Sequence, residues 1–167
     1  MRHIFSIFLL LPAIAWADDD KVARLKKNAD EVCQAVLKEN HEKLIDLTHP
    51  KVVEITGGRA KMLKILKEIA TELADQGIKF ESIDLETPEP IVVSGTHEFS
   101  VVPYVLRISK GKTKLRQKNY LLGVSADAGK TWRFINGPIP DSLRKAIDDF
   151  PAKLELPKEE KAMIEKD

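Results

Sequence analysis

Apolar positions recur at spacings of three and four along the first half of the chain, which is the pattern of an amphipathic helix. This pattern predicts helices over 22–37, over 41–48 and, most clearly, over 59–76. The second helix should end before Pro50, because a residue that precedes proline is disfavoured in the helical region. Gly77 stands where a glycine commonly closes a helix, so the third helix should end there.

After Gly77 the period changes to two, which is typical of strands. Strands are predicted over 78–85, 114–125 and 131–136, and 91–93 together with 99–109 should form one long, interrupted strand. A β-bulge would absorb the one slip in the alternation of the first strand, and Pro103 favours an edge position or a bulge. A last short helix should begin at Asp141 or Ser142 and end at Pro151. Helices followed by an antiparallel meander predict an α+β domain with N-terminal helices packed on one face of the sheet.

The two hairpin turns predict which side chains share a face. A first hairpin centred on Lys112 places Tyr104 opposite Tyr120, and a second one, centred on Ala128, pairs Val124 with Trp132. One face then carries Val102, Tyr104, Leu106, Ile108, Tyr120, Leu122, Val124, Trp132 and Phe134. The other carries Phe99, Val101, Val105, Arg107, Leu115, Gln117, Asn119, Leu121, Arg133 and Ile135. A slip of one residue would turn a whole strand over.

The apolar face suits the side covered by helices. The mixed face is too apolar for plain solvent, and we expect it to form a homodimer contact. The residues expected in that contact are Phe99, Val101, Val105, Leu121 and Ile135.

Composition limits the classes of partner. The 167 residues include 43% apolar residues and one Cys, and the net charge is +1. A chain of this size builds a single core, and one Cys excludes an internal disulfide. Balanced charge argues against a nucleic-acid partner. We expect one domain over 18–150 and an extended, charged tail over 151–167.

The first 17 residues have the parts of a secretory signal peptide. A basic start is followed by an apolar run over 4–15, and Ala15-Trp16-Ala17 matches the A-x-A cleavage pattern. The apolar run is too short to cross a bilayer of about 30 Å as a helix. We expect residues 1–17 to be removed and the protein to be exported, to the periplasm or outside the cell, without a stable membrane anchor. An uncleaved N-terminal anchor is the alternative.

A turn motif comes directly after the predicted strand over 114–125. Ser125, Asp127, Gly129, Thr131 and Trp132 match S-x-D-x-G-x-T-W, which resembles an Asp-box, the turn best known from sialidase propellers. Asp can accept hydrogen bonds from nearby backbone N–H groups, and glycine supplies a positive φ. A propeller needs several such boxes and a longer chain, so we expect a structural turn here.

A longer stretch carries a second resemblance. Leu47-Thr-His-Pro50, Gly57-Gly58 before a helix, and the run 120–137 resemble exported bacterial proteins of the nuclear transport factor 2-like, or ketosteroid-isomerase-like, superfamily. The resemblance spans most of 20–137 and implies a curved sheet wrapped around helices, a cone with an internal cavity. That superfamily includes enzymes, ligand carriers and dimerisation modules, so the fold does not choose a function.

These observations favour an exported, non-catalytic domain that binds a small apolar ligand or acts as a dimerisation module. Tyr104, Tyr120 and Trp132 are the candidate ligand-binding residues, because their polar tips lie on an otherwise apolar face. A cross-strand aromatic pair is the alternative for the two tyrosines. A small isomerase- or hydratase-like enzyme inside the cone is the second hypothesis. No catalytic residue is predicted, because that face offers no carboxylate or His.

Other chemistry has weaker signals. The spacing of His41, His49 and His97 matches no metal-binding pattern, and no nucleotide fingerprint is present, so neither a metal nor a cofactor is expected. Cys33 should be a buried thiol, with an intermolecular disulfide as the alternative. A row of basic residues near the first hairpin turn would keep an edge soluble or would bind an anionic partner. Its members are Lys110, Lys112, Lys114, Arg116 and Lys118.

Overall fold

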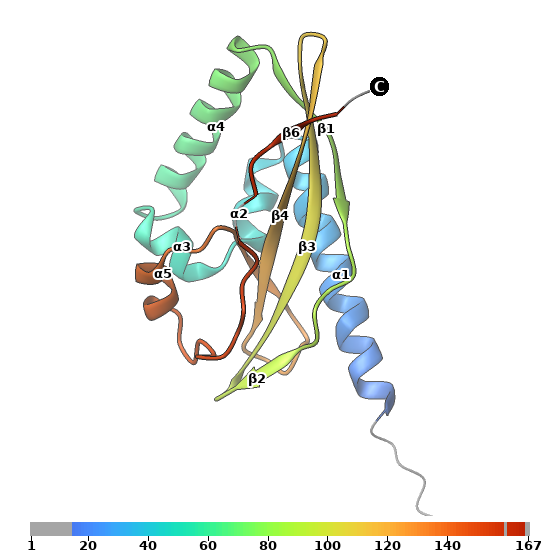
Figure 1. The fold of residues 1–167 in the computed structure, drawn as a ribbon. Helices are drawn as coiled ribbons and strands as arrows, with labels where there is room; N and C mark the ends of the chain where they lie inside the picture. Colours follow the sequence, from blue (N-terminus) through green and yellow to red (C-terminus); the bar gives the residue numbers. More distant parts are fainter. Residues whose placement is uncertain (1–14, 159, 166–167) are drawn as a thin grey trace, which may run out of the picture.

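The protein is an α+β domain in which N-terminal helices lie against a curved, unclosed antiparallel sheet of six strands (Figure 1). The computed structural model describes residues 15–158 and 160–165, and the predicted signal peptide lies outside them apart from 15–17. The helices are α1 (Ala15–Leu37), α2 (His41–Leu47), α3 (Pro50–Ile55), α4 (Arg59–Asp75) and α5 (Asp141–Ala146). The strands are β1 (Ile78–Leu85), β2 (Val92–Ser94), β3 (His97–Lys110), β4 (Thr113–Ser125), β5 (Arg133–Asn136) and β6 (Met163–Ile164). The predicted fold class is confirmed.

Helix α3 was not predicted. Pro50 was interpreted only as the end of the preceding helix, but it is also the first residue of α3. Proline is tolerated there because the first turn of a helix needs no backbone donor. His49 caps the new helix, since its Nδ1 accepts a hydrogen bond from the backbone N–H of Lys51 at 3.2 Å.

The sheet has the order β1-β3-β4-β5, with β2 beside β3 and β6 beside β4. The predicted bulge in β1 is confirmed, because the register shifts between Phe80 and Ser82. Pro103 was expected at an edge or a bulge, but β3 lies inside the sheet. Proline has no backbone N–H to donate to a neighbouring strand. Pro103 is tolerated because it lies just past the end of β1, and its carbonyl still accepts a hydrogen bond from the Glu86 N–H at 2.8 Å.

Both predicted hairpin registers are wrong by one residue. Tyr104 lies opposite Asn119, and Val124 lies opposite Arg133. The first turn consists of two residues, 111–112, so its centre falls between residues and not on one. The two shifts together turn β4 over relative to β3 and β5 and leave those two strands on their predicted faces.

The helix side of the sheet holds the first of two cores. It combines α1 and α2 with alternate positions of β3, β4 and β5. Its buried members are Leu25, Ala29, Val32, Leu47, Val102, Tyr104, Leu121, Trp132 and Phe134. Leu121 therefore lies under the helices, and its predicted place on the opposite face is wrong.

The opposite face of the sheet holds the second core, and the C-terminal part of the chain covers it. We call residues 137–156 the C-terminal cover; Figure 1 shows it passing in front of the sheet while α1 lies behind. The sheet contributes Phe99, Val101, Tyr120, Leu122, Val124 and Ile135, and the cover contributes Ile139, Leu143, Ile147, Phe150, Leu154 and Leu156. The apolar patch predicted for a dimer contact is thus buried within one chain. Dimerisation stays a prediction, now without that surface.

Beyond the cover, the chain continues along the sheet. Met163 and Ile164 form β6 beside β4, and Glu165 Oε1 lies 3.0 Å from Nε of Arg107. Glu160 lies 3.9 Å from the ammonium of Lys118. Acidic residues of the segment predicted as a charged tail therefore pair with basic residues of β3 and β4.

Candidate functional site

A cavity of about 510 Å³ lies between the helices and the sheet. Its walls come from α1, α2, α4 and the helix-side face of the strands, and they are mostly apolar, with Val36, Leu66 and Phe80 among them. Ligand-binding cavities have volumes of roughly 300–1,000 Å³ and combine apolar walls with a few polar groups. This cavity is therefore the candidate binding site.

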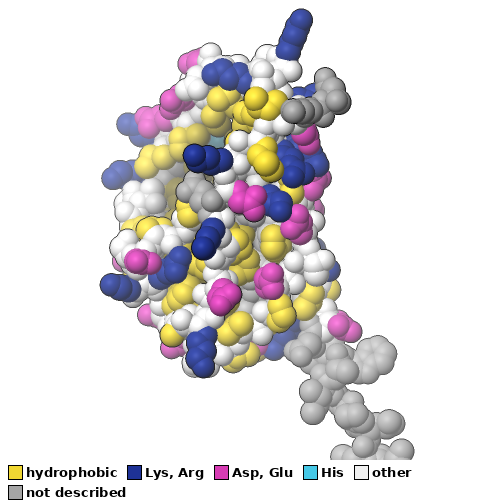
Figure 2. All heavy atoms as spheres, viewed as in Figure 1, with side chains coloured by type: hydrophobic (Ala, Val, Ile, Leu, Met, Phe, Trp, Pro, Cys, Tyr) yellow, Lys and Arg dark blue, Asp and Glu magenta, His cyan; other side chains and the backbone are white. Residues whose placement is uncertain are grey.

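The loose packing of α4 leaves the cavity open. None of the residues of α4 is buried, and Ile69 is 47% exposed. Arg59 at the start of the helix pairs with Asp46 of α2, with an N–O distance of 2.6 Å. Figure 1 shows α4 standing off from the sheet, and Figure 2 shows apolar side chains at the surface along it. The apolar stripe that predicted a packed helix thus borders empty space.

Tyr104 places a hydroxyl group in the cavity wall. Its hydroxyl donates to Asn136 Oδ1 at 2.7 Å. Burial raises the pKa of Tyr104 to about 12, although the hydrogen bond to Asn136 lowers it. Cys33 also lines the cavity, and burial raises the pKa of its thiol to about 12. Both groups therefore keep their protons at neutral pH, so neither side chain brings a negative charge to the cavity.

Two asparagines in the cavity wall were missed by the sequence analysis. Asn136 lies at the end of β5, and Asn119 lies opposite Tyr104 on β4. The amide oxygen of Asn119 accepts a hydrogen bond from the N–H of Tyr120 at 2.8 Å, while that of Asn136 accepts from Tyr104. Each side chain thus has its amide N–H₂ left to offer to a ligand. Asn is disfavoured in strands, and this was the available signal.

Of the three candidate ligand-binding residues, only Tyr104 lies in the cavity wall. Tyr120 lies on the opposite face, where its hydroxyl accepts a hydrogen bond from the N–H of Ile139 at 3.3 Å. Trp132 is 0% exposed and packs into the helix-side core. The predicted pairing of the two tyrosines is wrong because β4 is turned over.

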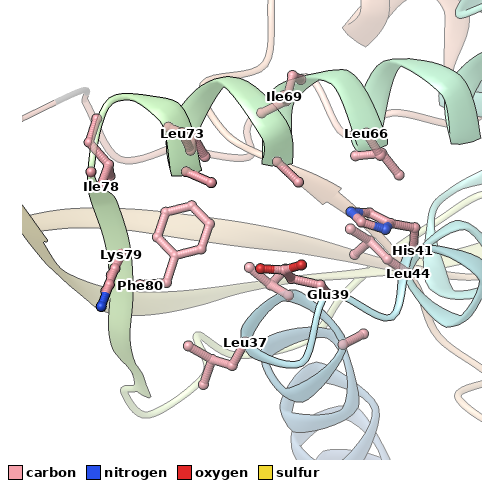
Figure 3. A pocket seen from close by; sticks show the side chains of 15 residues that line it. Leu37, Glu39, His41, Leu44, Leu66, Ile69, Leu73, Ile78, Lys79 and Phe80 are labelled. Carbon is pink, nitrogen blue, oxygen red and sulfur yellow. The ribbon is translucent and has the colours of Figure 1, made fainter.

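A second hollow of about 490 Å³ adjoins the first and shares Val36, Leu44, Leu66 and Phe80 with it. It lies between the end of α1, the second half of α4 and the start of β1. Figure 3 shows side chains of α4 pointing toward Phe80 across the hollow, with the Glu39 carboxylate between Phe80 and His41.

Glu39 adopts a backbone conformation that is unusual for its residue type. Helix α1 ends with hydrogen bonds from Asn40 N to Ala35 O at 2.8 Å and from Glu39 N to Val36 O at 3.1 Å. This is a Schellman motif, whose left-handed position is usually filled by glycine. Glu39 fills it with a φ of 52°. A residue with a Cβ in this conformation costs about 1 kcal/mol relative to glycine.

The turn after β4 is built around Asp127. Its Oδ1 accepts hydrogen bonds from the backbone N–H groups of Thr131 at 2.8 Å and Lys130 at 3.1 Å, and from Ser125 Oγ at 2.8 Å. Burial alone would raise the pKa of Asp127, but these hydrogen bonds outweigh it and lower the pKa to about 2. Gly129 has a φ of 75° and its carbonyl accepts a hydrogen bond from Arg24 Nε of α1. The turn thus fastens the end of the hairpin to the helix layer.

Replacing Asp127 by Ala should lower the free energy of unfolding by about 1–3 kcal/mol, because several backbone donors lose their acceptor. The folded-state pKa lies below the ordinary value of 3.8. The stabilisation is therefore present above that value and lost as the pH falls toward 2. Urea unfolding of parent and variant at pH 7 and pH 2.5 measures this. Equal stabilities at pH 7, or a difference that persists unchanged in acid, would contradict the prediction.

His49 and His97 have different surroundings. Burial lowers the pKa of His49, and the nearby charge of His97 lowers it further. His97 Nδ1 lies 3.0 Å from Asp149 Oδ2, and this contact holds the C-terminal cover to the β2–β3 turn. Within residues 15–158 and 160–165, no group of three or more His, Cys, Asp or Glu side chains is arranged to hold a metal ion.

The cavity, its asparagines and the adjoining hollow therefore form the candidate site. Within the same described ranges, no helix has the length and apolar character needed to cross a membrane. Comparison with protein-family models gives no match, and comparison with curated proteins also gives none.

Proposed function

We propose that this protein binds a small apolar molecule in the cavity between α4 and the sheet. The observation that carries the proposal is the position of α4, whose apolar stripe borders a cavity of about 510 Å³ while none of its residues is buried. Covering apolar surface stabilises by about 25 cal/mol per Å². A ligand in the cavity would therefore bury the surface that folding leaves uncovered.

The polar groups of the cavity support a ligand with an oxygen atom in an otherwise apolar body. The amides of Asn119 and Asn136 have N–H₂ groups to donate, and Tyr104 and Asn136 already form a pair. A few polar groups among apolar walls fix the orientation of a ligand.

The proposal also draws on the sequence resemblances. Helices over a curved sheet with a cavity between them are what a member of the nuclear transport factor 2-like superfamily would have. The A-x-A pattern at Ala17 favours export, so we propose a carrier that works outside the cytoplasm.

An isomerase- or hydratase-like enzyme is the alternative function. It would need a general acid or base beside the ligand. The described residues that line the inner cavity include no Asp, Glu or His, Tyr104 keeps its proton at neutral pH, and Glu39 and His41 lie in the adjoining hollow. These observations favour binding over catalysis.

Filling the cavity should abolish binding of an apolar probe. Leu66 lies on α4 and lines both hollows, so Leu66→Trp places an indole in the space that a ligand would use. We expect the parent protein to bind the dye N-phenyl-1-naphthylamine, and Leu66→Trp to weaken binding at least about tenfold, the loss of roughly 1.4 kcal/mol. Fluorescence titration measures both dissociation constants.

Lys67→Trp is the matched control, because Lys67 is the next residue of α4, is exposed and lines neither hollow. It should bind the dye like the parent. A parent that does not bind the dye, or equal binding by both tryptophan variants, would overturn the proposal.

A further inference from the structure

We propose that the ligand is a cationic amphiphile, whose apolar chain enters the cavity under α4 and whose positively charged head is held by Glu39. This inference rests on the proposed binding function and adds the chemical class of the ligand. It assigns a binding role to the adjoining hollow at the end of α1.

The geometry of the hollow provides the first argument. Apolar side chains of α4 line one side, and Phe80 of β1 lies on the other (Figure 3). The Glu39 carboxylate lies between Phe80 and His41 in Figure 3, and the hollow adjoins the inner cavity at Leu66 and Phe80, which line both. An apolar chain that occupies the inner cavity would leave the hollow beside Glu39 for its head.

Charge provides the second argument. None of the ion pairs found among the described residues involves Glu39. Lys79 also lines the hollow, but Figure 3 shows its ammonium directed away from the Glu39 carboxylate. His41 lies on the other side and offers a ring nitrogen as a further polar contact. Glu39 is exposed, so its carboxylate lies where it can meet the positively charged head of a ligand whose chain occupies the inner cavity.

The backbone of Glu39 provides the third argument. Glycine would fit its left-handed position without strain, and the φ of 52° therefore costs stability in this chain. Unfavourable backbone conformations of this kind cluster at functional sites, although Ala128 adopts one within a structural turn of this chain. Here the Glu39 side chain lines the hollow, so this costly conformation places a carboxylate there.

Head-group preference tests the inference. The probes are dodecyltrimethylammonium, dodecyl maltoside and dodecyl sulfate, each below its micelle concentration and each displacing N-phenyl-1-naphthylamine. We expect the parent to bind the cationic chain roughly twofold to fivefold more tightly than the neutral one, and the anionic chain most weakly. The preference should shrink as salt is added, because the head lies near solvent.

Three variants separate binding from folding. Glu39→Gln should lose the preference for the cation while its affinity for dodecyl maltoside stays unchanged. Glu39→Gly should lose the preference and also melt about 2–4 °C higher than the parent, because the turn is relieved of strain. Glu155→Gln removes an exposed carboxylate that lines neither hollow, and it should match the parent.

A parent without head-group preference, or a Glu39→Gln variant that keeps it, would overturn this inference alone, provided the dye still binds and Leu66→Trp still blocks it. If the parent binds neither dye nor amphiphile, the proposed function fails and the inference fails with it.

Discussion

Replacing Leu122 by Glu should unfold the protein. Leu122 is 0% exposed and lies on β4 between Val101 of β3 and Ile135 of β5. Losing a buried leucine side chain lowers the free energy of unfolding by about 2–5 kcal/mol. An ionised carboxylate buried there without a partner lowers it by several kcal/mol more. The sum is comparable to the whole stability of a domain, about 5–15 kcal/mol. Circular dichroism and urea unfolding should show a chain that is unfolded in water.

Ile164→Glu is the matched control for that substitution. Ile164 lies in β6 at the margin of the sheet and is 68% exposed. The same new charge is solvated at that position, so the free energy of unfolding of the variant should lie within about 0.5 kcal/mol of the parent's. A folded Leu122→Glu variant with a similar midpoint would mean that the opposite face of the sheet is not a core.

Removing the C-terminal cover should have an effect of similar size. A chain that ends at Pro140 lacks Leu143, Ile147, Phe150, Leu154 and Leu156, which pack on the second core. Burial of these side chains contributes on the order of 5–10 kcal/mol, at about 1.5–3 kcal/mol for each fully buried one and less for the others. We expect this chain to aggregate or to remain unfolded, as sedimentation and circular dichroism would show.

A chain that ends at Pro157 distinguishes the role of the cover from that of the last residues. It keeps the cover and loses β6 together with the ion pairs of Glu160 and Glu165. Exposed pairs of this kind contribute about 0–1 kcal/mol each, so this chain should fold and stay in solution. If the chain ending at Pro140 also folds and stays in solution, the C-terminal cover is not needed for folding, and its contacts with the second core do not stabilise the protein as argued.

The sequence predicted the kind and order of most elements because local periodicity determines them. The strand β1 was predicted at its observed limits, and its bulge was visible as a slip in alternation. The two faces of β4 were assigned the wrong way round, and the reason is physical. Tyr120, Leu122 and Val124 are apolar, but so is Leu121 on the other side of the strand, because the sheet is covered on both faces. Alternation cannot orient a strand whose two sides are both buried.

The candidate site was harder to predict than the fold. Tyr104 was identified because a polar tip on an apolar face is visible in sequence. The amphipathic pattern of α4 does not reveal whether its stripe meets a packed core or a cavity, since both need the same side chains. Glu39 was missed because a Schellman position held by glutamate has no sequence signature.

The position of the C-terminal cover in the chain has a consequence for folding during synthesis. The strands of the sheet's second core are all synthesised by Asn136, but the side chains that shield them come later, at Leu143, Ile147 and Phe150. A growing chain therefore contains a complete apolar face before it contains the means to cover it. Partly folded chains with such a face aggregate readily. A cell that makes this protein has to keep each nascent chain unfolded, or apart from its neighbours, until the covering residues up to Leu156 have emerged.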